Sequence, residues 1–386
     1  MESGRISGGK RYAVKPIYLD YNASTPIDPK VAAAMQQTIE RDFGNPSSAH
    51  WAGAPAHALV DMARQQVADL LGCSPTEVVF TSGGSESNNL AIKGLYFARQ
   101  KPGAHIITTQ VEHPAIVGPC KFLERLGARI SWLPVDSTGR MNPDDLRQAI
   151  SADTILISIM HANNEVGTVQ PIEECAGIAQ EHGIPFHTDA AQSVGKIPTK
   201  VGELGVELLT IAGHKLYAPK GVGALYVRSG IEVEPLLHGA SHESGRRAGT
   251  ESALLTTALG EACELASDLS HVANIEALRD RFWVALREAL GDHVVLNGHP
   301  ENRLPNTLNV SFVDRVGAEI LEKMPEVAAS TGSACHTGRV ELSPVLEAMG
   351  VSQETGAGAV RFSLGRMTTA QEIDTVSDRL VHLLTT

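Results

Sequence analysis

The sequence lacks several features that would assign it to a class at once. Its 386 residues contain no apolar run longer than a strand, so no membrane-spanning segment is predicted. Positive charge is scarce: the formal net charge is -12 at pH 7, which disfavours nucleic acid or an anionic membrane as partner. The five cysteines form no CxxC pair, which favours neither a disulfide framework nor a zinc site. Residues 1–15 lack the apolar stretch of a secretory signal, so we expect a cytoplasmic protein that acts on small molecules or proteins.

The sequence does contain a regular alternation of strand and helix patterns. Short apolar runs such as 77–82 and 105–109 are separated by amphipathic helical stretches. Nearly continuous apolar strands indicate a mostly parallel sheet with helices on both faces. We therefore predict a three-layer α/β domain over residues 26–255 and a smaller α+β domain made of residues 1–25 and 256–386.

Three helices of the larger domain have recognisable signals. Pro29 suits the first turn of a helix over 30–43, because its missing N–H has no helical partner there. Gly72 suits the end of a helix over 55–72. A further helix is predicted over 85–100.

Lys215 stands at the exit of a predicted buried strand. In the segment LLTIAGHKLYAPKGVG, an apolar run ends at Gly213, and Lys215 follows two residues later. Ligands collect at the strand ends of parallel sheets, and partial desolvation there lowers the pKa of a lysine toward that of a usable nucleophile. Taken alone, a lysine is far more often a solvated surface residue, so the rest of the chain must supply the reason to place Lys215 in a site.

Two other strand exits complement Lys215. The segment VVFTSGGSESNN places a double-glycine turn before a helix that begins near Ser85, where exposed amides and a hydroxyl suit a phosphate group; an ordinary capped helix is the alternative. Asp189 ends the strand IPFHTD, where a carboxylate can pair with a protonated ring nitrogen or cap a helix. Pyridoxal phosphate needs an amine, an anion for its pyridinium and a phosphate cradle. Lys215, Asp189 and Ser85 supply one each.

Three more polar residues are candidates for the same site. His113 follows a strand, where an imidazole can stack on a flat cofactor and move protons, or cap a helix. Asn164 also follows a strand, and its amide can bond a ring oxygen or a carboxylate. Arg361 lies in an apolar strand of the second domain, where it needs an anionic partner such as a substrate carboxylate.

Cys335 differs from the other cysteines in its surroundings. It lies in TGSACHTG, whose small residues predict a mobile loop, and a loop-borne thiol is a candidate nucleophile. Buried, inert positions are predicted for Cys73, Cys120, Cys175 and Cys263.

These motifs together resemble a known family. From Ile17 to Arg366 the order is LDYNASTP, FGNPSS, FTSGGSESNNLAIKG, EHPAI, HANNEVG, HTDAAQSVGK, GHKLYAPKG, RAGTES, TGSAC and RFSLGR. This series is similar to cysteine desulfurases of the iron-sulfur-cluster type, in the class V aminotransferase branch of the fold-type I pyridoxal-phosphate enzymes. Selenocysteine lyases are close relatives of that family.

The resemblance implies pyridoxal 5'-phosphate as cofactor and a role for each polar residue around it. Lys215 would bind the cofactor covalently and take the α-proton of the substrate. Asp189 would hold the pyridinium nitrogen, and His113 would stack on the ring and shuttle protons. Gln192 and Asn164 would surround the ring oxygen.

The phosphate has its own implied residues. Gly84, Ser85 and His214 would hold it within the subunit. In a homodimer, Thr250 would reach into the site of the partner subunit.

Substrate chemistry is implied for two further residues. Arg361 would bind the carboxylate of L-cysteine, or of selenocysteine, and Cys335 would take the sulfur as a persulfide while alanine is released. A sulfur-acceptor protein would be a further partner.

The sequence departs from the family pattern at two positions. Ala212 stands where relatives usually have a serine that contacts the phosphate, and Ser244 stands where they usually have an arginine. Selenocysteine lyase or another C–S lyase remains an alternative function. An aminotransferase and a catalytically silent regulatory homologue are two more.

Overall fold

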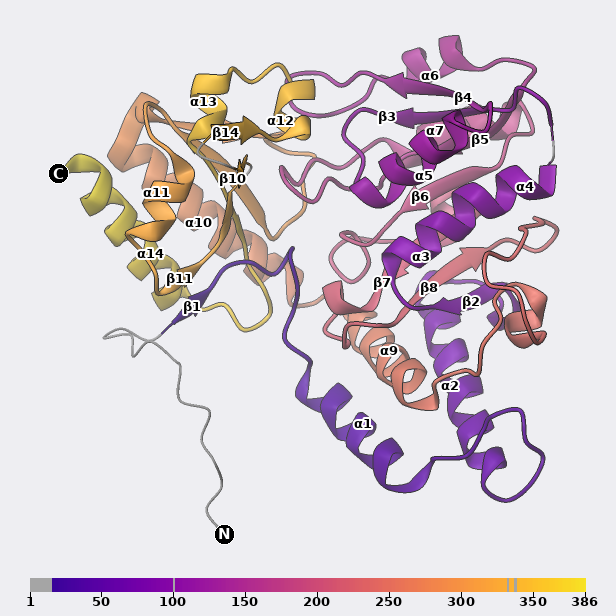
Figure 1. The fold of residues 1–386 in the computed structure, drawn as a ribbon. Coiled ribbons are helices and arrows are strands. Elements are labelled where there is room, and N and C mark those ends of the chain that lie inside the picture. Colours follow the sequence, from indigo (N-terminus) through magenta and orange to yellow (C-terminus); the bar gives the residue numbers. More distant parts are fainter. Residues whose placement is uncertain (1–15, 100, 332, 337–338) are drawn as a thin grey trace.

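The computed structural model describes residues 16–386 except 100, 332, 337 and 338, and it leaves the side chains of residues 333–341 undescribed. Residues 1–15 therefore lie outside the described residues, as does the side chain of Cys335. Two lobes are visible in Figure 1, with the central sheet in one and the C-terminal helix in the other.

Seven strands form the sheet of the larger lobe, in the order β2-β8-β7-β6-β5-β3-β4. Neighbours from β7 to β4 pair in parallel, whereas β8 is antiparallel to both β2 and β7. The prediction of a mostly parallel sheet is confirmed. The strand bounds are Val78–Thr81 (β2), His105–Thr109 (β3), Arg129–Leu133 (β4), Thr154–Ser158 (β5), Phe186–Asp189 (β6), Leu208–Ala212 (β7) and Gly223–Val227 (β8).

Helices cover both faces of this sheet, as expected for a three-layer domain (Figure 1). Because side chains alternate along a strand, Leu209 of β7 packs with the helices of one face, whereas Leu208 packs with those of the other. The first face is covered by α1 (Pro29–Arg41), α2 (Gly53–Leu71), α6 (Pro143–Ala149), α7 (Ile172–Glu181), α8 (Val201–Leu204) and α9 (Ala253–Ala266). The second is covered by α3 (Gly84–Asn89), η2 (Leu90–Gly94), α4 (Leu95–Arg99) and α5 (Pro114–Glu124).

The residues predicted at the start of α1 and at the end of α2 lie at those positions in the structure. Pro29 is the first residue of α1, and the Asp28 carboxylate caps that helix by accepting from the Lys30 amide. Gly72 ends α2 with φ of 70°, a left-handed conformation that favours glycine. The helix predicted over 85–100 is less regular than expected, because the π-helical segment η2 separates α3 from α4.

The smaller lobe is built on an antiparallel sheet with the order β12-β15-β10-β9. The strands are β9 (Val294–Asn297), β10 (Thr307–Phe312), β12 (Ser330–Thr331) and β15 (Ala359–Ser363). A short parallel pair joins β1 (Ile17–Tyr18) to β11 (Val327–Ala328). The helices are α10 (Val272–Leu290), α11 (Gly317–Glu322), α12 (Pro344–Ala348), α13 (Gln353–Ala357) and α14 (Ala370–Thr385).

The backbone around Cys335 forms a hairpin where the sequence predicted a loop. Strand β13 (Ser333–His336) pairs antiparallel with β14 (Arg339–Leu342), and Cys335 lies opposite Val340. Backbone pairing over four residues thus gives this small-residue segment regular structure.

The other cysteines follow the prediction with one exception. Cys120, Cys175 and Cys263 are buried, as expected for inert thiols. Cys73 is only half-buried, because it lies just after the end of α2, where the chain returns to the surface.

The predicted domain boundary falls inside a helix. Residues 255 and 256 belong to α9, whose buried Leu259 and Cys263 pack in the core of the larger lobe. Ile17 and Leu19, by contrast, belong to the core of the smaller lobe. We therefore propose that the larger domain continues through Ala266, and that the N-terminal segment joins the smaller one.

Among the residues that the structure describes, no helix combines the length and apolar character that crossing a membrane requires.

Candidate active site

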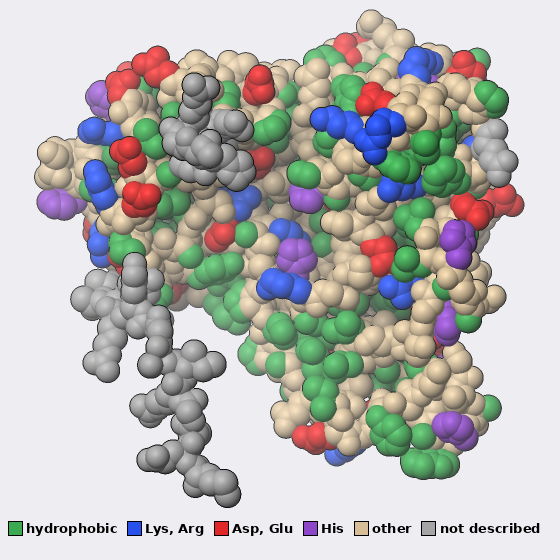
Figure 2. All heavy atoms as spheres, viewed as in Figure 1, with side chains coloured by type: hydrophobic (Ala, Val, Ile, Leu, Met, Phe, Trp, Pro, Cys, Tyr) green, Lys and Arg blue, Asp and Glu red, His purple; other side chains and the backbone are tan. Residues whose placement is uncertain are grey.

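A cavity of about 420 Å³ lies beyond the ends of the central strands. Its lining comes from the segments after β2, β3, β5, β6 and β7, together with residues 22–23 and Arg361 of β15. Figure 2 shows basic and histidine side chains gathered on the face between the two lobes. This position agrees with the rule that ligands of open α/β sheets bind outside the carboxyl ends of the strands.

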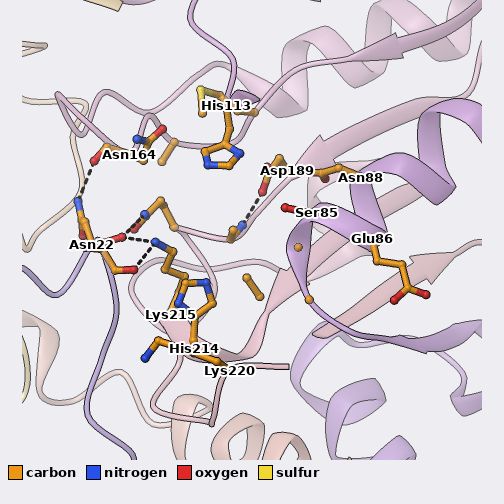
Figure 3. Close-up of a pocket in the computed structure, with 18 of the residues that line it drawn as sticks. Asn22, Ser85, Glu86, Asn88, His113, Asn164, Asp189, His214, Lys215 and Lys220 are labelled. Atoms are coloured by element: carbon orange, nitrogen blue, oxygen red, sulfur yellow. Dashed lines mark hydrogen bonds between the residues drawn. The ribbon is translucent and has the colours of Figure 1, made fainter. Parts of the chain in front are cut away.

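Lys215 enters this cavity from the turn after β7. The short 3-10 helix Gly213–Lys215 directs its side chain toward the N-terminal segment, where Nζ donates to the carbonyl oxygens of Asn22 and, at 2.8 Å, Ala23 (Figure 3). Burial, followed by the positive charge of Arg361, lowers the pKa of Lys215 from 10.5 to about 8. A useful fraction of the amine is therefore neutral near pH 8, as nucleophilic attack on a carbonyl requires.

The double-glycine turn forms one wall of the cavity. Gly83 has φ of 145°, and α3 begins directly after it at Gly84. A Cβ atom on Gly84 would lie 3.2 Å from the Cβ of Ala212, so the backbone of the turn approaches β7 closely. Ser85 also lines the cavity, so that amide and hydroxyl donors lie where a phosphate could be held.

His214 lies beside the same wall with an unused ring nitrogen. Its Nδ1 is buried and has no hydrogen-bond partner among the described residues. Burial, then the charges of Lys215 and Lys220, lowers the pKa of His214 to about 4, so the ring is neutral at physiological pH. A buried polar atom without a partner fits a site whose ligand supplies that partner.

Asp189, at the end of β6, and His113, which follows β3, both face the cavity (Figure 3). Oδ2 of Asp189 accepts a hydrogen bond of 2.7 Å from Nδ2 of Asn88, and Oδ1 accepts one of 2.9 Å from the Ala191 amide. His113 caps α5, its Nδ1 accepting from the Ala115 amide at 3.1 Å. Desolvation lowers the pKa of His113, which the charge of Asp189 opposes and that of Lys215 reinforces. The ring is thus a neutral imidazole that is able to take up a proton.

Arg361 is buried and already has an anionic partner. Its Nη2 donates to Oδ1 of Asp20 at 2.8 Å and to Ser330 Oγ at 3.0 Å, while Nη1 donates to the Asn164 carbonyl at 2.9 Å. Nε is buried and has no partner in the described part of the chain. The predicted need for an anion is thus met within the protein, while the Nε–H remains to be paired.

The structure brings most of the predicted residues to one cavity. Its lining includes Gly84, Ser85, His113, Asn164, Asp189, Gln192, His214, Lys215 and Arg361. Thr250 is exposed and is not part of that lining. For Cys335 the structure gives the backbone alone, in β13.

Three polar residues around the cavity have no role in the prediction from sequence. Asn22 and Asp20 belong to the motif LDYNASTP, and Lys196 ends the motif HTDAAQSVGK. Lys196 donates to Gln192 and Asn22, next to Lys215. Their position inside two recognisable motifs is the signal that could have found them.

Comparison with known proteins assigns the fold and the site to a family. The family model Aminotransferase class-V matches residues 17–376. The chain belongs to this family. It is 47% identical over 374 residues to a cysteine desulfurase IscS of Dictyoglomus turgidum, covering 96% of this chain and 95% of that protein. A cysteine desulfurase IscS of Methanosarcina thermophila is 46% identical over 366 residues, with 94% and 90% covered.

Solved structures place the chain in the same part of the class-V aminotransferase family. A NifS-like protein superposes with a TM-score of 0.90 at 35% identity, covering 96% of this chain and 99% of that one. The structure described as SspA in complex with cysteine superposes with a TM-score of 0.80 at 38% identity, covering 92% and 100%. The predicted membership among the cysteine desulfurases and the fold-type I architecture are confirmed.

Proposed function

We propose that this protein is a pyridoxal-phosphate-dependent cysteine desulfurase that converts L-cysteine to L-alanine and transfers the sulfur to Cys335. The observation that carries the proposal is the convergence of Lys215, Asp189 and His113 on one cavity. The relatives named cysteine desulfurase, which are 46–47% identical, support the choice of reaction.

The residues of the cavity fit pyridoxal phosphate. The close approach of Gly84 to Ala212 leaves backbone donors beside Ser85, and His214, whose Nδ1 is unpaired among the described residues, lines the same cavity. The carboxylate of Asp189 would hold the protonated ring nitrogen. When bound, the cofactor supplies an electron sink for the substrate's α-carbon.

The protein's own groups would perform the remaining steps. Lys215, with its pKa of about 8, would bind the cofactor as a neutral amine and then accept the α-proton. The neutral imidazole of His113 would carry protons above the ring. Arg361, whose Nε has no partner among the described residues, would bind the substrate carboxylate beside Asn164.

The sulfur transfer balances without another reactant. The thiolate of Cys335 would attack the substrate sulfur, so that an S–S bond forms as the C–S bond breaks. A proton replaces sulfur on the β-carbon, and the products are L-alanine and a persulfide on Cys335. An external thiol or a sulfur-acceptor protein would then remove the sulfur, which iron-sulfur cluster assembly would use. We infer a reducing, cytoplasmic setting because the thiol must be reduced between turnovers.

A homodimer is part of this proposal. Thr250 is exposed on its own subunit, on a loop that a second copy could cover. Phe43 and Trp51 are 79% and 82% exposed and make an edge-to-face contact with each other, so they offer an apolar surface for such a copy.

Parallel assays of the wild type and Cys335→Ser test the reaction. We expect wild type with L-cysteine and a thiol reductant to release alanine and sulfide in equal amounts, and Cys335→Ser to retain pyridoxal phosphate but lose sulfide release. Cys73→Ser is the matched control, because burial raises the pKa of that thiol to about 12. Sulfide release by Cys335→Ser at the wild-type rate would overturn the persulfide route. Turnover of selenocysteine alone would favour a selenocysteine lyase, and a requirement for a keto acid would favour an aminotransferase.

A further inference from the structure

Lys196 lies four residues after Gln192, in the turns that follow β6, and is hydrogen-bonded to it. Its Nζ donates a hydrogen bond of 2.9 Å to Oε1 of Gln192 and one of 3.2 Å to Oδ1 of Asn22. The ammonium group thus lies behind the cavity, because Gln192 lines the cavity and Lys196 does not. Burial, followed by the charges of Lys215 and Arg361, lowers the pKa of Lys196 to about 7.

The amide of Gln192 has two chemically different ends, and the contacts decide which way it points. A protonated lysine can only donate, so while Lys196 is charged the end of the amide that faces it is the carbonyl oxygen. The other end, Nε2, then donates to the carbonyl oxygen of Asn22 at 2.9 Å. The same oxygen accepts from Nζ of Lys215. The N–H end of Gln192 and the reactive amine therefore lie close together, on one shared acceptor.

The second hydrogen bond of Lys196 goes to Asn22, whose side chain is also bonded to the smaller lobe. Oδ1 of Asn22 also accepts from Nδ2 of Asn306 at 3.0 Å, and Nδ2 of Asn22 donates to Thr307 Oγ1 at 2.8 Å. Asn22 is therefore held from several sides and does not depend on Lys196 alone. Gln192, by contrast, has its side-chain oxygen bonded to Lys196 in the described contacts.

We propose that Lys196 is a positioning residue that fixes the orientation of the Gln192 amide, so that its N–H faces the ring oxygen of pyridoxal phosphate bound at Lys215. This inference rests on the proposed function, because it concerns the same cofactor. Without Lys196, only the bond from Nε2 to the Asn22 carbonyl orients the amide, so a fraction of the molecules can turn it by half a turn and present its oxygen to the negatively charged ring oxygen. Two acceptors would then face each other, which weakens binding and removes stabilisation of the ionised ring oxygen.

Lys196→Met tests the proposal, because it keeps the aliphatic stem and removes the donor. We expect the apo protein to bind pyridoxal phosphate about tenfold more weakly. We also expect the pH midpoint of the visible absorbance of the bound cofactor to rise, since a donor that stabilises the ionised oxygen has been lost. Lys196→Arg should restore both properties. The control is Lys200→Met: Lys200 is exposed, donates to the Asp69 carbonyl and should be silent in both measurements.

A double-mutant cycle separates positioning from a general structural role. If Lys196 acts through the amide, Lys196→Met should change neither property further in a Gln192→Ala background. A change of the same size in both backgrounds would overturn the proposal, as would an unchanged affinity and midpoint in the single variant.

One more variant keeps the proposal testable even if Lys196→Met does not fold. Gln192→Glu keeps an acceptor for Lys196 but has no N–H to donate, so it should weaken binding and raise the midpoint. Wild-type behaviour of Gln192→Glu would overturn the proposal. Failure of the proposed function would look different, because the wild-type protein itself would not bind pyridoxal phosphate.

Discussion

Arg361 and Asp20 are joined by a hydrogen bond of 2.8 Å between Nη2 and Oδ1, although they are 341 residues apart in the chain. Both act on Lys215, and in opposite directions. The positive charge of Arg361 lowers the pKa of Lys215, and the negative charge of Asp20 raises it. The ion pair therefore influences the pKa of the Lys215 amine and also holds the guanidinium group of Arg361 in place.

Replacing either partner of this pair should shift the pH dependence of cofactor capture. The wild-type rate should rise with pH through about 8, because the neutral form of Lys215 reacts. Asp20→Asn should move this midpoint to lower pH, since a charge that stabilises the ammonium form is lost. Arg361→Met should move it to higher pH. The measurement is the rate of absorbance change when pyridoxal phosphate is added to apo protein across a pH series. Shifts in the same direction for both variants would contradict the electrostatic explanation.

The substitution Ala212→Ser should strengthen cofactor binding. Ala212 is buried in the wall beside Gly84, where a serine would add one hydroxyl donor for the phosphate. A hydrogen bond to a charged group predicts about a ten- to hundredfold lower dissociation constant for pyridoxal phosphate. Equilibrium titration of the apo protein measures it. Ser85→Ala is the matched variant and should weaken binding, whereas an unchanged constant in both would place the phosphate elsewhere.

Site residues can be predicted from the sequence when they directly follow a recognisable strand. Asp189 and Lys215 each follow an apolar run, so the parallel sheet can be predicted to bring them to one edge. The links between segments cannot be predicted in this way. The hydrogen bond between Asp20 and Arg361 forms only in the folded protein. The same holds for the bond from Asn22 to Thr307 in the smaller lobe. For Lys196 the motif HTDAAQSVGK is the only signal, because a lysine after a turn is ordinarily solvated.

Glu112→Gln should stabilise the protein at alkaline pH. Burial raises the pKa of Glu112 from 4.5 to about 8, while its Oε1 accepts from Thr109 Oγ1 at 2.8 Å and from the Met160 amide at 3.0 Å. Between these pH values the folded state holds a proton that the unfolded state has lost, so stability falls as pH rises through this window. Glutamine retains an acceptor but cannot ionise. The gain at pH 8 should be on the order of 2 to 4 kcal/mol.

Urea unfolding at pH 5 and pH 8 measures this effect. The difference in stability between the two pH values should be smaller in Glu112→Gln than in wild type. Glu124→Gln, which changes an exposed carboxylate on the following helix, is the control and should leave the difference unchanged. An identical pH dependence in Glu112→Gln and wild type would mean that Glu112 is ionised in the folded protein.

Mixing two inactive variants tests whether Thr250 serves the partner's site. Lys215→Ala should lack the reactive amine, and Thr250→Ala should weaken phosphate binding in the neighbouring subunit. In a mixed dimer, one site then has an intact lysine together with an intact threonine from the other chain. Random exchange of subunits should restore about a quarter of the wild-type desulfurase activity at limiting cofactor. If Thr250 served its own subunit, both sites of the mixed dimer would remain defective, and mixing would restore nothing.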